Sequence, residues 1–124
     1  SMRDTPFFHH VVMAHSIHKA VETEKLYTYH FNILRNLMEK TAAFYGYSDY
    51  KLCMTPEKDD VGGVIYDRMV NIMNHGNYSI FDPVEMQEEN KEHFSKLVLR
   101  FLATYKFNSK LFNELEKGEE YGNK

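Results

Sequence analysis

The stretch from about Glu24 to Tyr45 constrains the fold more than any other part of the chain. It contains no glycine or proline, and its apolar residues recur at the three- and four-residue spacing of a helix on two faces. A helix with two apolar faces must be covered on most of its sides, so we expect it to be central. One face carries Leu26, His30, Ile33, Leu37, Thr41 and Phe44, and the other carries Phe31, Leu34, Met38, Ala42 and Tyr45.

Proline, glycine and capping residues mark two further helices. Pro6 suits the first position of a helix that Asp4 or Thr5 would cap. A later helix is expected over residues 63–74, and Gly76 would close it. The apolar residues of this later helix, which we expect to pack inward, are Ile65, Met69, Ile72 and Met73.

The clearest start signal in the chain is the run Asp82-Pro83-Val84-Glu85, which has the form of a capping box. We expect it to begin a helix that continues to about Tyr105. The connection over residues 46–62 is irregular, with a short helical turn near 47–54. A short last helix would hold Leu111, Phe112 and Leu115, followed by a frayed tail over 117–124. Because no strand-like alternation is present, the sequence predicts an all-α bundle of four to five helices.

Length and composition indicate one globular domain. The chain has 124 residues, 43% of them hydrophobic and 15% aromatic. We take residues 3–124 as this domain and the leading Ser1-Met2 as a cloning remnant. The single Cys53 excludes an internal disulfide, and the absence of an apolar run of roughly 20 residues argues against a membrane span. These features favour a reducing, cytoplasmic location.

No cofactor, metal or broad nucleic-acid surface is expected from the sequence. The net charge is −3, so any RNA contact must come from a local patch. Gly62-Gly63 lacks the Lys-Ser/Thr sequel of a phosphate loop, so an ATPase activity would belong to another part of a parent protein. A metal site is a weaker alternative, since acidic partners at helical spacing are missing. It would use the four histidines of the first helix, which are His9, His10, His15 and His18.

Two polar groups stand out against this apolar pattern. Arg68, Asn71 and His75 fall within a roughly 60° sector of one helix, a combination suited to contact a phosphate. A helix-capping histidine and a solvated arginine are the simpler interpretation. Arg35 and Glu39 stand one turn apart on the central helix, where two charges are costly unless they meet partners. A structural ion pair and a functional pair are both open for them.

A resemblance connects these groups. A four-helix unit with an arginine, four to six residues, and then a histidine near the end of its third core helix resembles the HEPN family. Arg68 and His75, with six residues between them, meet that spacing. Residues 35–39 (Arg-Asn-Leu-Met-Glu), followed by Asn74-His75-Gly76, are similar to the nuclease region of ATPase-linked anticodon nucleases. The residue after the motif arginine is often polar in active HEPN ribonucleases and is Met69 here. Arg35 is therefore the stronger cation.

The resemblance implies a metal-independent endoribonuclease. Such chemistry needs a base for the 2′-hydroxyl proton, a cation for the phosphorane charge and an acid for the leaving oxygen. His75 would serve as base or acid, Arg35 as the cation, and Glu39 would hold Arg35 or share the proton transfer. Arg68, Asn71 and Asn74 would support His75 or bind the RNA phosphate.

The resemblance also implies partners and a setting. It implies tRNA cleaved to a 2′,3′-cyclic phosphate and a 5′-hydroxyl, pairing of two copies, and fusion to or docking on an NTPase in phage defence. The alternative is a non-catalytic HEPN-like module that dimerises or binds RNA or a partner. Convergence of Arg35, Glu39 and His75 in one place would favour the enzyme over the module.

Overall fold

The computed structural model describes residues 6–105, and this part of the chain is an all-α bundle. The expected last helix near 111–115 and the tail 117–124 lie outside the described residues. Among residues 6–105, no helix combines the length and apolarity needed to cross a membrane. The elements are α1 (Pro6–Thr23), α2 (Tyr29–Tyr45), α3 (Val64–His75) and α4 (Glu88–Thr104), with the short 3₁₀ turns η2 (Tyr50–Cys53) and η3 (Val61–Gly63).

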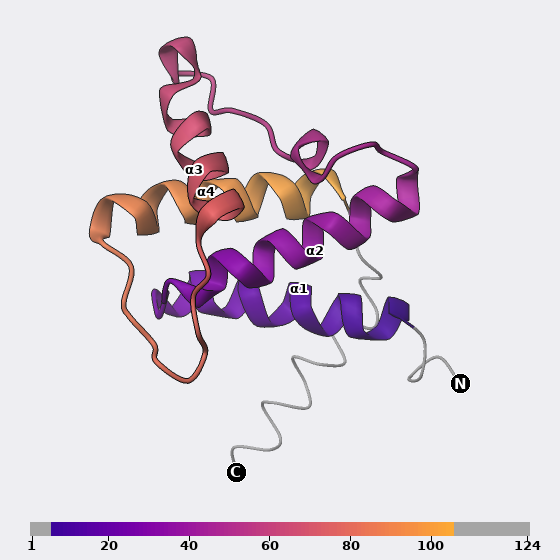
Figure 1. Ribbon diagram of the computed structural model, residues 1–124, viewed down its shortest axis with the longest axis horizontal. Coiled ribbons are helices and arrows are strands. Elements are labelled where there is room, and N and C mark those ends of the chain that lie inside the picture. The colour runs from indigo at the N-terminus through magenta and orange to yellow at the C-terminus, as the bar shows by residue number, and fades with distance from the viewer. Residues whose placement is uncertain (1–5, 106–124) are drawn as a thin grey trace.

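Helix α2 lies at the centre of the bundle, as its two apolar faces predict. It packs against α1, α3 and η2, while α4 packs against α1 and α3. Figure 1 shows α1, α2 and α4 running side by side, with α3 crossing α2 and α4 steeply. The largest fully buried side chains come from all four helices and include Ile17, Phe31, Leu34, Leu37, Met38, Met73, Phe94 and Phe101.

The burial of the inward residues of α3 is as expected, but the burial of the residues at the end of α2 is not. Met69 and Met73 are buried in the core. Phe44 and Tyr45 were placed on the packed faces of α2, yet both are exposed, Phe44 to 78%. They lie in the last turn of α2, where that helix has diverged from α1 (Figure 1). The helical pattern therefore continues past the point at which neighbours cover it.

Two predicted helix starts are wrong, and one contact explains both. Helix α1 continues to Thr23, Glu24 has a left-handed φ of 59°, and α2 begins only at Tyr29. Helix α4 begins at Glu88, six residues after Asp82. The two connections pair in extended form, since the Thr28 N–H donates to the Val84 carbonyl at 2.7 Å. The Met86 N–H likewise donates to the Leu26 carbonyl at 3.0 Å, so a capping box at 82–85 cannot form.

His30 sits buried in the first turn of α2 next to this pairing. Its Nδ1 accepts a hydrogen bond from the Tyr27 N–H at 3.0 Å, which requires that nitrogen to carry no proton. Burial lowers the pKa of His30, and burial also lowers the pKa of His10, which contacts the Leu37 carbonyl and Thr41. The folded state therefore prefers both imidazoles neutral.

We expect the protein to lose stability as the pH falls from about 7 toward 5. A histidine whose folded pKa lies below its unfolded value of about 6.5 stabilises fully above that pH and progressively less below it. Thermal unfolding followed by circular dichroism at several pH values measures the loss. The variant His30→Asn keeps an acceptor for the Tyr27 N–H but does not titrate. Its unfolding temperature should therefore fall less than that of the wild type as the pH is lowered. An equal fall in both proteins would contradict the assignment to His30.

Candidate active site

Arg35 joins the middle of α2 to the end of α3. Its Nε donates to Glu39 Oε1 at 2.7 Å, and its Nη1 donates to the carbonyls of Met73 at 2.9 Å and Asn74 at 3.3 Å. The last carbonyls of a helix lack partners within the helix and form the negative end of its dipole. A guanidinium is well suited to this place. The hydrogen bond to Glu39 raises the pKa of Arg35, which stays charged.

Tyr50 of η2 contacts both sides of this junction. The Arg35 guanidinium carbon lies 5.1 Å from the centre of the Tyr50 ring, within the range of a cation–π contact. The Tyr50 hydroxyl donates to Oδ1 of Asn74. Sequence reasoning missed Tyr50, because only the folded chain brings the turn after α2 against the end of α3.

Asn32 and Tyr78 fix the chain just beyond α3. Asn32, one turn before Arg35, donates from Nδ2 to the Tyr78 carbonyl at 2.7 Å. The Tyr78 ring packs on Phe31 and covers Gly76, where an added Cβ would lie 2.3 Å from Tyr78 Cε2. The turn over residues 73–78 is thus held to α2 at both ends. The space beside Gly76 is therefore filled by the Tyr78 ring.

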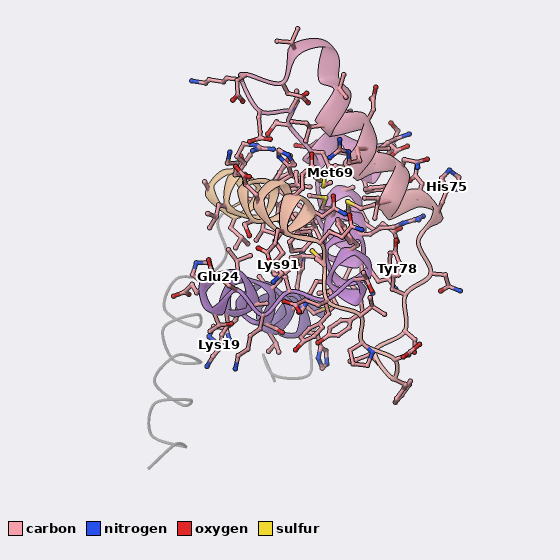
Figure 2. The ribbon with its side chains drawn as sticks, turned by 90° about the vertical axis from the view of Figure 1, so that its left-hand side faces the viewer. Lys19, Glu24, Met69, His75, Tyr78 and Lys91 are labelled. Atoms are coloured by element: carbon pink, nitrogen blue, oxygen red, sulfur yellow. The ribbon has the colours of Figure 1, made fainter. Side chains whose placement is uncertain are left out.

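His75 is the last residue of α3 and is exposed. Figure 2 shows it at the end of α3, directed away from the body of the molecule. Within residues 6–105 its side chain makes no hydrogen bond or ion pair. It directly follows Asn74, whose carbonyl and side chain contact Arg35 and Tyr50. The structure therefore joins Arg35, Glu39 and Asn74 in one network and places His75 next to that network along the chain.

Arg68 and Asn71 do not belong to this network. Arg68 Nη1 pairs with Glu89 Oε1 of α4 at 2.9 Å, so it serves the contact between α3 and α4. Asn71 is exposed. Among the described residues, no contact links Arg68 to Arg35, Glu39 or His75. Arg68 and His75 are separated because α3 has different neighbours at its two ends. Helix α4 lies along the start of α3, and α2 lies along the end of α3.

Two histidines of α1 have partners on different helices. His15 is buried, His10 contacts α2, and His18 Nδ1 lies 2.7 Å from Glu22 Oε1. In the described part of the chain, no three His, Cys, Asp or Glu side chains gather where they could hold a metal ion. The weaker alternative of a histidine metal site therefore gains no support from these residues.

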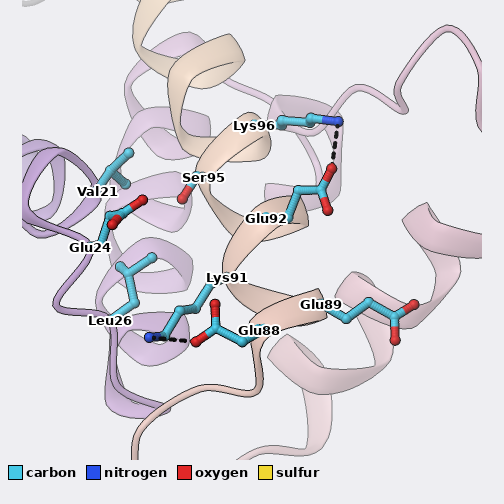
Figure 3. Close-up of a pocket in the computed structure, with 9 residues that line it drawn as sticks. All are labelled: Val21, Glu24, Leu26, Glu88, Glu89, Lys91, Glu92, Ser95 and Lys96. Carbon is cyan, nitrogen blue, oxygen red and sulfur yellow. Dashed lines mark hydrogen bonds and ion pairs between the residues drawn. The ribbon is translucent and has the colours of Figure 1, made fainter.

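An open pocket of about 730 Å³ lies elsewhere, between the end of α1 and the start of α4 (Figure 3). Its charged lining is mostly acidic, and its lysines are engaged: Lys91 pairs with Glu88 at 3.2 Å and Lys96 with Glu92 at 3.2 Å. Carboxylates repel a phosphate, and none of the predicted site residues lines this pocket. The candidate site is instead the surface where α2 meets the end of α3.

Comparison with known proteins gives a local match. The chain is 32% identical over 73 residues to the anticodon nuclease of Escherichia coli. That match covers 59% of this chain and 17% of the relative, so the chain spans only a small part of that protein. No protein-family model matches the chain, and no solved structure matches it. The chain therefore contains a region that is similar to part of an anticodon nuclease.

Removing the Arg35 side chain should destabilise the fold more than removing its carboxylate partner. Arg35→Ala leaves two carbonyls at the end of α3 without their donor, at a cost of about 1–2 kcal/mol. Glu39→Ala removes an exposed ion pair, at a cost of less than about 0.5 kcal/mol. Urea unfolding measures both costs. If Glu39→Ala lowers the free energy of unfolding as much as Arg35→Ala does, the hydrogen bonds from Arg35 to α3 do not stabilise the junction of α2 and α3.

Gly76→Ala should also destabilise, because its methyl group would overlap the Tyr78 ring and approach the Ile72 carbonyl oxygen to 2.6 Å. The backbone at Gly76 has φ −73°, so crowding and not backbone strain is the cause. We expect a loss of about 1–3 kcal/mol in the free energy of unfolding. Asn77→Ala, at the exposed neighbouring position, is the matched control and should cost less than about 0.5 kcal/mol. Equal values for the two variants would contradict the packing of Tyr78.

Proposed function

We propose that this chain carries a HEPN-type endoribonuclease domain that cleaves tRNA in the anticodon loop without a metal ion. One observation carries the proposal: the Arg35–Glu39 pair of α2 is bonded to the turn that presents His75. Arg35 and His75 together supply the cation and the proton-transfer group that cleavage of a phosphodiester bond needs. The local similarity to the E. coli anticodon nuclease supports the choice of substrate.

Arg35 has donors left for a phosphate. Nε donates to Glu39, and the two N–H groups of Nη1 face the Met73 and Asn74 carbonyls. The two N–H groups of Nη2 have no protein partner among residues 6–105. A guanidinium held on one side and open on the other can donate to the non-bridging phosphate oxygens and stabilise the phosphorane. In this scheme Glu39 holds Arg35 in place.

His75 moves the proton in this scheme. The 2′-oxygen attacks phosphorus as His75 accepts the 2′-hydroxyl proton, and the bond from phosphorus to the 5′-oxygen breaks. The leaving oxygen takes a proton from water or from a second donor. The products are a 2′,3′-cyclic phosphate and a 5′-hydroxyl. The exposure of His75 gives a folded RNA loop direct access, which suits a macromolecular substrate.

The setting is proposed on the same basis. The matched region is a small fraction of its E. coli relative, which fits a domain that works within a larger protein. We propose an effector of an NTPase active in phage defence, and two copies paired so that their sites adjoin. Arg68, Asn71 and the amide nitrogen of Asn74 are proposed as additional contacts for the RNA backbone.

A non-catalytic HEPN-like module is the second candidate. The observation that favours it is that three donors of Arg35 already serve structure, in a chain of net charge −3. Such a module would bind RNA or a partner surface without cleaving it. Cleavage of tRNA separates the two candidates, because a non-catalytic module would bind tRNA without cleaving it.

His75→Ala should abolish cleavage of total tRNA, with at least a 100-fold loss of rate, and leave stability within about 0.5 kcal/mol. The His75 side chain is exposed and makes no hydrogen bond or ion pair with the described residues, so its removal tests chemistry apart from folding. His9→Ala, a change at another exposed histidine, is the matched control and should retain activity. End-group chemistry should find the cyclic phosphate, and a chelator should not slow the wild type.

Two outcomes would contradict the proposed nuclease activity at this site. One is a wild type that leaves tRNA intact at micromolar protein, which favours the module. The other is equal cleavage by the wild type and His75→Ala, which would place the chemistry elsewhere. Inhibition by the chelator would overturn the metal-independent mechanism alone.

A further inference from the structure

We propose that Tyr50 is a positioning residue of this site: it fixes Arg35 and the turn before His75 relative to one another. The inference rests on the proposed function and extends it to a residue outside the Arg-Glu-His set. Tyr50 belongs to η2, so three separate segments of the chain meet at one side chain.

Tyr50 makes two different contacts, one from each part of its side chain. Its ring lies against the guanidinium of Arg35, 5.1 Å from ring centre to guanidinium carbon. Its hydroxyl donates to Oδ1 of Asn74, the residue before His75. Arg35 in turn donates to the backbone carbonyl of Asn74. The three residues therefore form a closed triangle of contacts that links α2, η2 and α3.

Tyr50 is itself firmly held. It is buried to 8% exposure, although its two partners lie at the surface. Asp49 caps η2, since its Oδ1 accepts from the Lys51 N–H at 2.8 Å, and its Oδ2 pairs with Lys51 Nζ at 3.3 Å. At the other end of η2, the buried Cys53 thiol donates to the Met38 carbonyl at 3.7 Å. Tyr50 is thus a buried reference for groups that lie at the surface.

The site needs such a reference. The ion pair of Arg35 with Glu39 is exposed on both sides, 38% and 51%, and such pairs alone hold a side chain weakly. The His75 side chain has no hydrogen bond among the described residues. Its position therefore depends on the turn that contains Asn74. Displacement of a reacting group by about 1 Å can cost 100-fold in rate.

Tyr50 is not placed to transfer a proton. Its hydroxyl is directed at Asn74, and burial raises the pKa of Tyr50, so it keeps its proton near neutrality. Its removal should therefore lower the rate by a constant factor across neutral pH. A proton donor would instead remove one limb of the pH profile.

The test uses Tyr50→Phe, which keeps the ring, and Tyr50→Leu, which removes both contacts. We expect kcat for tRNA cleavage to fall about tenfold in Tyr50→Phe and further in Tyr50→Leu, with KM within about twofold. The pH profile of Tyr50→Phe should run parallel to that of the wild type from about pH 6 to 9. Circular dichroism at the assay temperature confirms that each variant is folded.

The partner residue provides a second, independent arm. Asn74 is exposed, so Asn74→Ala should fold. It should lower kcat at least as much as Tyr50→Phe does, because it removes the acceptor for the Tyr50 hydroxyl and also the proposed RNA contact of the Asn74 amide nitrogen. If Tyr50 acts through Asn74, then adding Tyr50→Phe to Asn74→Ala should change kcat by less than about twofold. Independent losses that multiply in the double variant would overturn the coupling.

The failure of this inference can be told from the failure of the proposed function. An inactive wild type overturns both. An active wild type with an equally active Tyr50→Phe overturns the role of Tyr50 alone. A folded Tyr50→Phe that loses one limb of the pH profile would make Tyr50 a catalytic group and not a positioning residue.

Discussion

The contact on which the candidate site depends is the guanidinium of Arg35 against the carbonyls of Met73 and Asn74. It gives the last turn of α3 the donors that the helix cannot supply itself, and it sets a positive charge at the negative end of that helix. It also brings a cation and a carboxylate from α2 beside the residue that precedes His75. One interaction therefore caps the end of a helix and brings Arg35, Glu39 and Asn74 together.

Helix α2 combines the core of the bundle with the scaffold of the site. Its buried residues, among them Leu34, Leu37 and Met38, fix the helix within the bundle. Its polar residues Asn32, Arg35 and Glu39 fall within a roughly 60° sector that meets the turn over residues 73–78. Asn32 and Arg35 hold the two ends of that turn, while Glu39 holds Arg35. The packed side of the helix thus gives the polar side a fixed orientation.

The parts of the fold that periodicity governs could be predicted from the sequence. The central place of α2, the limits of α3 and the inward side chains of Met69 and Met73 follow from a 3.6-residue repeat and from Gly76. The start of α4 could not be predicted. The local preference of residues 82–85 for a helix cap competes with pairing to residues 26–28, and only the folded chain brings those segments together.

Within the candidate site, the sequence indicated residue types but not their supports. Arg35 and Glu39 stood out as charges on an apolar helix, and their ion pair is confirmed. Tyr50 carried no signal, because its role comes from tertiary contacts with Arg35 and Asn74. Arg68 matched a motif spacing, yet its partner is Glu89 of α4, which a pattern within one helix cannot reveal. The catalytic roles of Arg35, Glu39 and His75 stay predictions.

A crystal structure of this protein with an RNA substrate tests the proposed site most directly. The RNA is the anticodon stem-loop of a tRNA that the protein cleaves, prepared without the 2′-hydroxyl at the scissile position. Without that nucleophile the RNA should bind intact. We expect the scissile phosphate to lie within hydrogen-bond distance of Arg35 Nη2, with the His75 ring beside the 2′ position. A scissile phosphate bound away from the junction of α2 and the end of α3 would contradict it.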